Sequence, residues 1–175
     1  SHGRGNPRLG FGVERLMKFF QICWTSAALV WCFASHVLAA QCSGGIVKLR
    51  GDWGAVTFRV EVADTKASRA RGLMHREHLA GQSGMLFLYP APQSVSFWMR
   101  NTLIPLDMLF IDQAGLVSMI HHRAEPHDEK LIYGGKEVLS VLEINGGMAT
   151  ELGITLGSEV QSPLLPQKSA AWPCS

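Results

Sequence analysis

The chain has 175 residues, a length that predicts a single domain, and it carries 16 lysines and arginines against 14 aspartates and glutamates. Residues 1–39 hold four of the basic residues and one of the acidic ones, so the remainder carries twelve basic and thirteen acidic residues. That balance provides no basic surface of the kind that binds nucleic acid or anionic lipid, and we expect neither as a partner.

A leader is predicted at the N-terminal end. Residues 1–16 precede the first methionine and are expected to be an upstream segment that is not part of the fold. Residues 17–39 have a basic start, an apolar centre and a small-residue end, which is the pattern of a secretory signal peptide. We expect cleavage after Ala39 or Ala40, a periplasmic or secreted protein, and no stable membrane span after cleavage.

Two alternatives remain for this segment. The apolar run approaches the length of a membrane anchor, although polar residues interrupt it. Lipidation of Cys42 is the other alternative, but the residue before a lipidated cysteine should be small and here it is Gln41.

Cys42 and Cys174 are the cysteines that remain once the leader is removed, one near each end. In an oxidising compartment they would form one disulfide. The alternative is two free thiols on frayed ends of the chain.

The first predicted elements form a hairpin and a helix. Apolar and polar residues alternate over residues 56–62, which predicts a half-buried strand. A strand at 46–49 and a turn at 51–54 precede it. Thr65 is a candidate N-cap for a short helix that ends near Gly72.

The rest of the chain continues the β pattern. An apolar strand at 85–89 is expected to end at Pro90 and Pro92. The strands predicted after it span 94–101, 106–112, 116–123, 137–145 and 159–161, with a surface loop at 124–135, a short helix or turn at 146–153, and an irregular tail at 162–175. Seven or eight short strands predict a mainly β domain over residues 44–161, an antiparallel β-sandwich or barrel of jelly-roll type with one or two short helices.

Three motifs carry a family resemblance: Arg-Ala-Arg-Gly-Leu-Met-His-Arg at 69–76, Gly-Met-Leu-Phe-Leu at 84–88, and Phe-Trp-Met-Arg-Asn-Thr-Leu-Ile-Pro-Leu-Asp at 97–107. With these the chain resembles the bacterial and archaeal family called domain of unknown function 192, over about residues 56–160. The resemblance implies no activity, but Glu143 matches a glutamate of the family pattern.

Trp98, Arg100 and Asn101 are the first candidate ligand-binding residues. Alternation along the strand places Trp98 and Arg100 on one face, opposite Phe97 and Met99. An indole beside a guanidinium suits a pocket with an aromatic wall and fixed polar groups. The alternative is a structural role, in which Trp98 covers a second apolar layer, Arg100 lies along it, and Asn101 satisfies the following turn.

Asp107 and Glu143 are the other candidates, each a carboxylate among apolar neighbours on a predicted strand. A buried carboxylate needs hydrogen-bond donors. The predicted helix supplies Arg71, which completes the candidate ligand-binding set, and Arg69, Arg71 and Arg76 are the expected partners of Asp107 in a purely structural bridge.

No cofactor, metal site or catalytic residue is predicted. His75 and His78, or His121 and His122 with the following loop, do not give the spacing of a closed metal site. The sequence favours a small-ligand-binding or accessory module of the cell envelope, whose partner is a small molecule or an envelope component. Two alternatives remain open: a glycoside-type hydrolase using Asp107 and Glu143 as a carboxylate pair, and a purely structural envelope protein.

Overall fold

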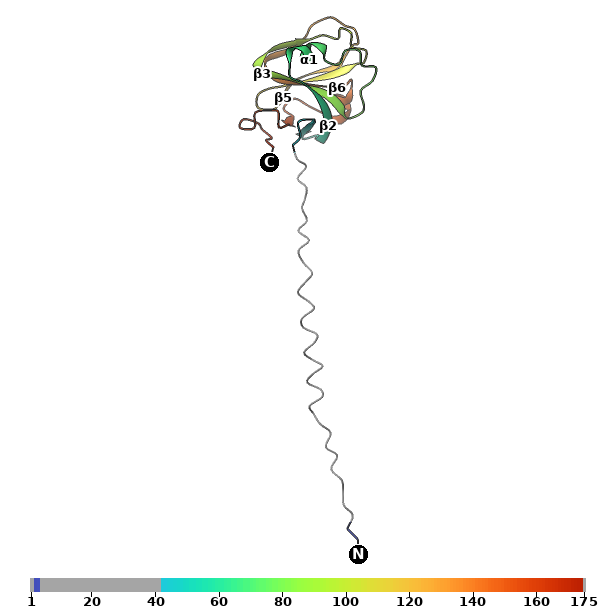
Figure 1. Ribbon diagram of the computed structural model, residues 1–175, viewed down its shortest axis with the longest axis vertical. Coiled ribbons are helices and arrows are strands. Elements are labelled where there is room, and N and C mark those ends of the chain that lie inside the picture. Colours follow the sequence, from blue (N-terminus) through green and yellow to red (C-terminus); the bar gives the residue numbers. More distant parts are fainter. Residues whose placement is uncertain (1, 4–41, 175) are drawn as a thin grey trace. The chain divides into compact units, whose positions relative to one another are not determined.

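A computed structural model describes residues 2–3 and 42–174 (Figure 1). The predicted signal peptide at 17–39 lies outside these ranges. Neither of the two helices in the described part of the chain is long and apolar enough to cross a membrane.

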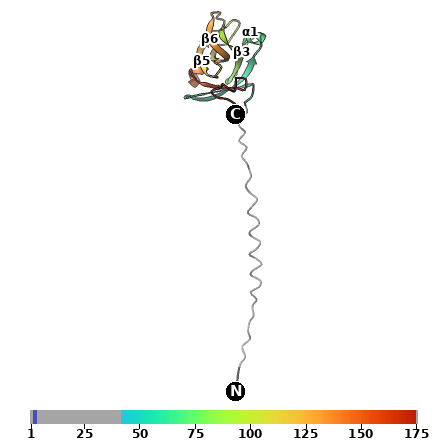
Figure 2. The same cartoon turned by 90° about the vertical axis from the view of Figure 1, so that its left-hand side faces the viewer.

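A single mixed sheet organises the domain (Figures 1 and 2). Its strands are β1 Ile46–Gly51, β2 Gly54–Ala63, β3 Ser83–Phe97, β4 Leu106–Ile111, β5 Val117–Ala124, β6 Ile132–Asn145 and β7 Glu159–Gln161, and its helices are α1 Lys66–Arg71 and α2 Met148–Leu152. The strand order is β5-β4-β6-β3-β2-β1-β7. A β-bridge from Leu116 to Glu159 joins the two edges, so the sheet is curled.

This architecture corrects part of the fold prediction. The domain is mainly β, mostly antiparallel and has two short helices, as predicted, but the jelly-roll sandwich is not confirmed. β2 and β3 are parallel, with Val60 opposite Gly84. The reason is the connection between them, since a parallel pair needs a crossover and α1 lies in that crossover.

The hairpin and the first helix are confirmed. β1 pairs antiparallel with β2, from Ile46 opposite Arg59 to Gly51 opposite Gly54. Thr65 caps α1 by accepting a hydrogen bond from the Ser68 N–H at 3.0 Å, and Ser68 reaches back to the Thr65 N–H. This is a capping box with serine in the place of the usual glutamate.

Two strand boundaries were wrong in the sequence prediction. β3 does not end at Pro90 but continues to Phe97, and β6 begins at Ile132 rather than at residue 137. The pairing of β3 with β6 passes from Leu88–Ser140 directly to Gln93–Val138, with a register shift between them. The prolines lie in that unpaired interval, where a missing N–H breaks no ladder hydrogen bond.

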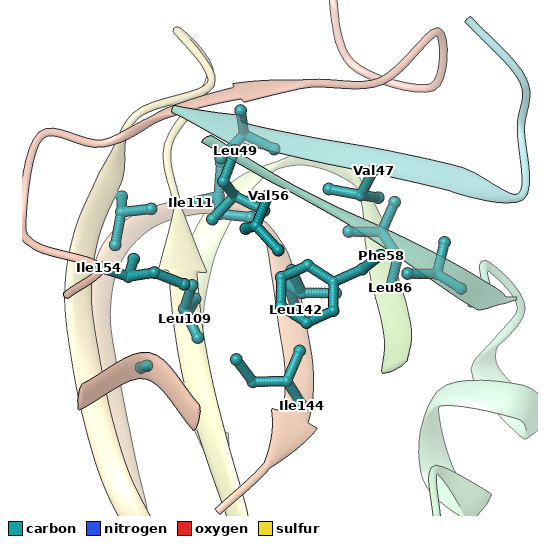
Figure 3. Packing of buried hydrophobic residues seen from close by; sticks show 14 of the residues in the cluster. Val47, Leu49, Val56, Phe58, Leu86, Leu109, Ile111, Leu142, Ile144 and Ile154 are labelled. Carbon is teal, nitrogen blue, oxygen red and sulfur yellow. The ribbon is translucent and has the colours of Figure 1, made fainter. Parts of the chain in front are cut away.

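Two apolar clusters lie on opposite faces of the central strands. The first contains Leu86, Leu109 and Leu142 and collects side chains from β1, β2, β4 and β6 (Figure 3). The second contains Phe87, Met108 and Val141, the neighbours of those residues in the chain. Successive side chains of a strand point to opposite faces of the sheet. Asp107 therefore lies on the face of the first cluster, and Glu143 lies on the face of the second.

The tail after β7 is irregular, as predicted, and a disulfide and two side-chain contacts hold it against the domain. Cys42 and Cys174 form a disulfide, so the free-thiol alternative does not hold. The Arg50 guanidinium lies 4.3 Å from the centre of the Trp172 ring, and Gln161 donates a hydrogen bond to the Pro173 carbonyl at 2.9 Å.

Candidate functional site

A pocket of about 330 Å³ lies between α1 and β3, and we call it the α1–β3 pocket. Its lining residues are Lys66, Arg69, Ala70, Arg71, Gly72, Leu73 and Met74 from the helix and the turn after it, Phe87, Tyr89, Ser96 and Phe97 from β3, and Trp98, Thr102 and Glu143. The volume is at the small end of the range for ligand-binding clefts.

Four aromatic rings, together with Ala70, Leu73 and Met74, form the apolar part of the wall. Phe87 and Phe97 meet edge to face, with ring centres 5.1 Å apart. Tyr89 has the Arg69 guanidinium 5.1 Å from its ring centre, and Trp98 has that of Arg100 at 4.4 Å. Rings held by such contacts give a rigid wall.

The helix supplies the positive charge at this pocket. α1 is six residues long and is followed by the C-cap Gly72, whose positive φ of +49° favours glycine. Arg69 donates to the Leu88 carbonyl at 2.7 Å and to the Asp64 carbonyl, which leaves its charge unneutralised. Among the described residues no carboxylate forms an ion pair with Lys66, Arg69 or Arg71.

Glu143 is the buried acid of the pocket. It lies on β6 opposite Met85 of β3 and Met108 of β4, and only 4% of its surface is exposed. Burial raises the pKa of its carboxyl to about 8. No described group donates a hydrogen bond to this carboxyl, so it keeps its proton at neutral pH and presents an unpartnered polar group to the pocket.

Tyr89 also stays protonated near neutral pH. Burial raises its pKa above the ordinary value of 10.0, the charge of Arg69 lowers it, and the nearby Glu143 carboxyl raises it. The phenol is therefore a neutral hydrogen-bonding group next to the acid.

Backbone hydrogen bonds tie together the loops beside the pocket. The His75 N–H donates to the Asn101 carbonyl at 2.8 Å, and the His127 N–H donates to the Thr102 carbonyl at 3.2 Å. His75, Asn101 and His127 all have φ between 55° and 63°, an uncommon conformation for residues other than glycine. Strained positions of this kind gather where a structure holds a particular shape for function.

Comparison with known proteins identifies the family of this chain. The model of the family described as "DUF192: Uncharacterized ACR, COG1430" matches residues 47–162, which include β2, α1, β3 and β6 and thus all of the pocket lining. The chain belongs to the DUF192 family. The predicted resemblance is therefore confirmed. No protein of curated function matches the chain.

Two solved structures of other proteins share the fold. One is a protein of unknown function from Novosphingobium aromaticivorans DSM 12444, 44% identical, with a TM-score of 0.65 over 66% of this chain and 82% of that one. The other is described as a "putative transcription regulator" from Sinorhizobium meliloti 1021; it is 36% identical, with a TM-score of 0.68 over 71% of this chain and 98% of that one.

Three of the six predicted site residues of this DUF192 protein line the α1–β3 pocket: Arg71, Trp98 and Glu143. Arg100 lies outside it, stacked on Trp98 and paired with Glu129 at 2.7 Å. Asn101 lies in the adjacent turn and is exposed. The alternation that placed Trp98 opposite Phe97 does not hold, because β3 ends at Phe97 and both rings line the pocket.

Asp107 lies apart from this site, on the face of the first apolar cluster. Its carboxylate accepts hydrogen bonds from the backbone N–H groups of Arg123, Gly147 and Ala149 at 2.7–2.8 Å. The arginine partners predicted for it were wrong, since these three donors belong to the main chain. Asp107 and Glu143 face opposite sides of the sheet, so they do not form the carboxylate pair of a glycosidase.

The sequence prediction missed several lining residues, among them Lys66, Phe87 and Tyr89. Tyr89 had a detectable signal, since it directly follows the 84–88 motif, whereas Lys66 lies three residues before the 69–76 motif. Phe87 lies inside the 84–88 motif but has the pattern of an ordinary core residue of an apolar run. Thr102 lies inside the 97–107 motif and directly follows the predicted site residue Asn101. In the described part of the chain, no three His, Cys, Asp or Glu side chains are placed to hold a metal ion.

Proposed function

We propose that this DUF192 protein is an exported small-ligand-binding module whose binding site is the α1–β3 pocket. The observation that carries the proposal is the Glu143 carboxyl, buried, without a hydrogen-bond donor among the described residues, and lining a cavity. In the described residues only Ser140 Oγ is fully enclosed without a hydrogen-bond partner, so the Glu143 oxygens are accessible from the pocket. A polar group in this position costs free energy unless a partner in the pocket satisfies it. A ligand in the pocket supplies that partner.

The composition of the pocket supports binding of a small molecule. Aromatic walls with a few fixed polar groups are typical of ligand sites. Other hollows of 420–560 Å³ occur in the described residues, but none is lined by a buried ionisable side chain. The near balance of acidic and basic residues after residue 39 also favours a small molecule over nucleic acid as the partner.

The Cys42–Cys174 disulfide supports export. Structural disulfides persist in oxidising compartments such as the periplasm and are rare in the cytosol. Together with the signal-peptide pattern of residues 17–39, this bond favours a mature protein outside the cytoplasm.

Blocking the pocket is expected to abolish binding. Ala70 lines the pocket and is exposed, so Ala70→Trp places an indole at the pocket without disturbing the core. Ala67 is exposed on the same helix and does not line the pocket, so Ala67→Trp is the matched control. Ligand-observed NMR with a small-molecule library of acids, bases and neutral compounds should give compounds that bind the wild type and Ala67→Trp but not Ala70→Trp.

Two results of that screen would count against the proposal. One is a library in which no compound binds the wild type. The other is a set of binders that Ala70→Trp and Ala67→Trp affect equally, which would place binding elsewhere on the domain.

Export is expected to leave a defined N-terminus. The full chain, expressed in a bacterium with a periplasm and recovered from that compartment, should begin at Ala40 or Gln41 when sequenced by mass spectrometry. Its two remaining cysteines should resist alkylation until they are reduced. Recovery of the uncleaved chain with free thiols from the cytosol would contradict this part of the proposal.

A further inference from the structure

We infer that the ligand of the α1–β3 pocket is a small organic anion with an apolar body, whose acid group is held by the cations of α1 and hydrogen-bonded by Glu143. This inference rests on the proposed function and adds the chemical class of the ligand. Three features support it: the positive charge of the lining, the guanidinium groups that already lie against two of the aromatic rings, and the proton on the buried Glu143 carboxyl.

The charge of the lining favours an anion. The titratable side chains that line the pocket are Lys66, Arg69, Arg71, Tyr89 and Glu143. Three of them are cations without a carboxylate partner among the described residues. Tyr89 is neutral at physiological pH, and so is Glu143 below about pH 8. The pocket lining therefore carries an excess of positive charge, and a low-dielectric wall strengthens its field.

Glu143 suits an anion in its protonated form. A protonated carboxyl is a hydrogen-bond donor, and it donates a short, strong bond to a carboxylate oxygen. The acid group of such a ligand would give the Glu143 hydroxyl an acceptor, which no described residue provides.

A cationic ligand fits the same residues less well. Aromatic rings around a carboxylate are a known arrangement for ammonium groups. Here, however, Tyr89 and Trp98 already have the guanidinium groups of Arg69 and Arg100 against their rings. An ammonium ligand would approach three unneutralised cations and would have to remove the proton from Glu143.

Three probes with the same phenyl group separate these cases: benzoate, benzyl alcohol and benzylamine. Isothermal titration calorimetry at pH 7 should give a Kd for benzoate at least tenfold lower than for the other two. As the pH rises from 8 to 9, the Kd of benzoate should increase by up to tenfold, because Glu143 loses its proton and repels the anion.

Substitutions should assign these effects to residues. Lys66→Gln and Arg71→Gln should each raise the benzoate Kd at least fivefold. Lys136→Gln, which removes an exposed cation outside the pocket, should leave it unchanged. Glu143→Gln, whose amide N–H can donate but does not titrate, should abolish the increase in the benzoate Kd above pH 8.

Several outcomes would overturn the inference. Benzylamine binding more tightly than benzoate, with an affinity that rises through pH 8, would identify a cation site. Binding of none of the three probes, or a pH dependence that survives in Glu143→Gln, would also overturn it. Neutral or basic compounds blocked by Ala70→Trp would then leave the proposed function standing, whereas the absence of any such compound would remove both.

Discussion

Replacing Asp107 with alanine is expected to lower the free energy of unfolding by about 5 kcal/mol, enough to unfold most of the protein at 37 °C. The Asp107 carboxylate accepts three main-chain hydrogen bonds, two of them from Gly147 and Ala149 at the start of α2. Gly147 has a left-handed φ of +93° and no side chain caps this helix locally, so Asp107 caps it from β4. Removing the carboxylate leaves buried N–H groups without acceptors.

Two further variants test the mechanism. Asp107→Asn keeps the shape but loses the charge and one acceptor, so we expect a loss of about 3 kcal/mol. Asp112 also accepts two main-chain hydrogen bonds, from Ala114 and Leu116, but its donors are only partly buried. Asp112→Ala should therefore cost only about 1 kcal/mol.

Urea unfolding followed by circular dichroism measures these differences. If Asp107→Ala lowers the free energy of unfolding by less than 1 kcal/mol, the N–H groups of Arg123, Gly147 and Ala149 find other acceptors in the variant. Benzoate binding to Asp107→Asn under conditions where it is folded should match the wild type, because Asp107 faces away from the α1–β3 pocket. A selective loss of binding in that variant would contradict this separation.

The comparison of Asp107 with Glu143 shows how far the sequence could predict the site. Both residues interrupt apolar strands, so their burial and their need for partners were predictable from alternation. Their partners were not. The donors to Asp107 are main-chain groups from 16 to 42 residues away, and only the turn between β6 and α2 brings two of them to β4. Side-chain charge alone therefore predicted arginine partners for Asp107.

The pocket itself depends on two features that local patterns do not encode. β3 ends at Phe97, which turns Trp98 to the same cavity as its neighbour. The parallel pairing of β2 with β3 sets α1 in the crossover between these strands, where its cations reach the rings of β3. The capping residues predicted α1 correctly, but its position over the sheet follows from long-range pairing.

Glu143 is expected to make the protein less stable as the pH rises. The pKa of its carboxyl is about 8 in the folded protein, against an ordinary value of 4.5 for the exposed group in the unfolded chain. Between these pH values the folded state keeps a proton that the unfolded state has lost. The free energy of unfolding should therefore fall from about pH 4.5 to about pH 8 and change little above that. The size of this contribution is about 5 kcal/mol.

Glu143→Gln isolates this contribution because the amide fills the same space and does not titrate. Urea unfolding at pH 5, 7 and 9 should show the variant gaining on the wild type as the pH rises, with most of the gain between pH 5 and 8. Glu61→Gln is the matched control, since that carboxylate is 54% exposed and pairs with Arg76 on the surface. Parallel stability curves for the wild type and Glu143→Gln would mean that the buried acid is ionised in the folded protein. An ionised Glu143 would in turn favour a cation over an anion as the ligand of the pocket.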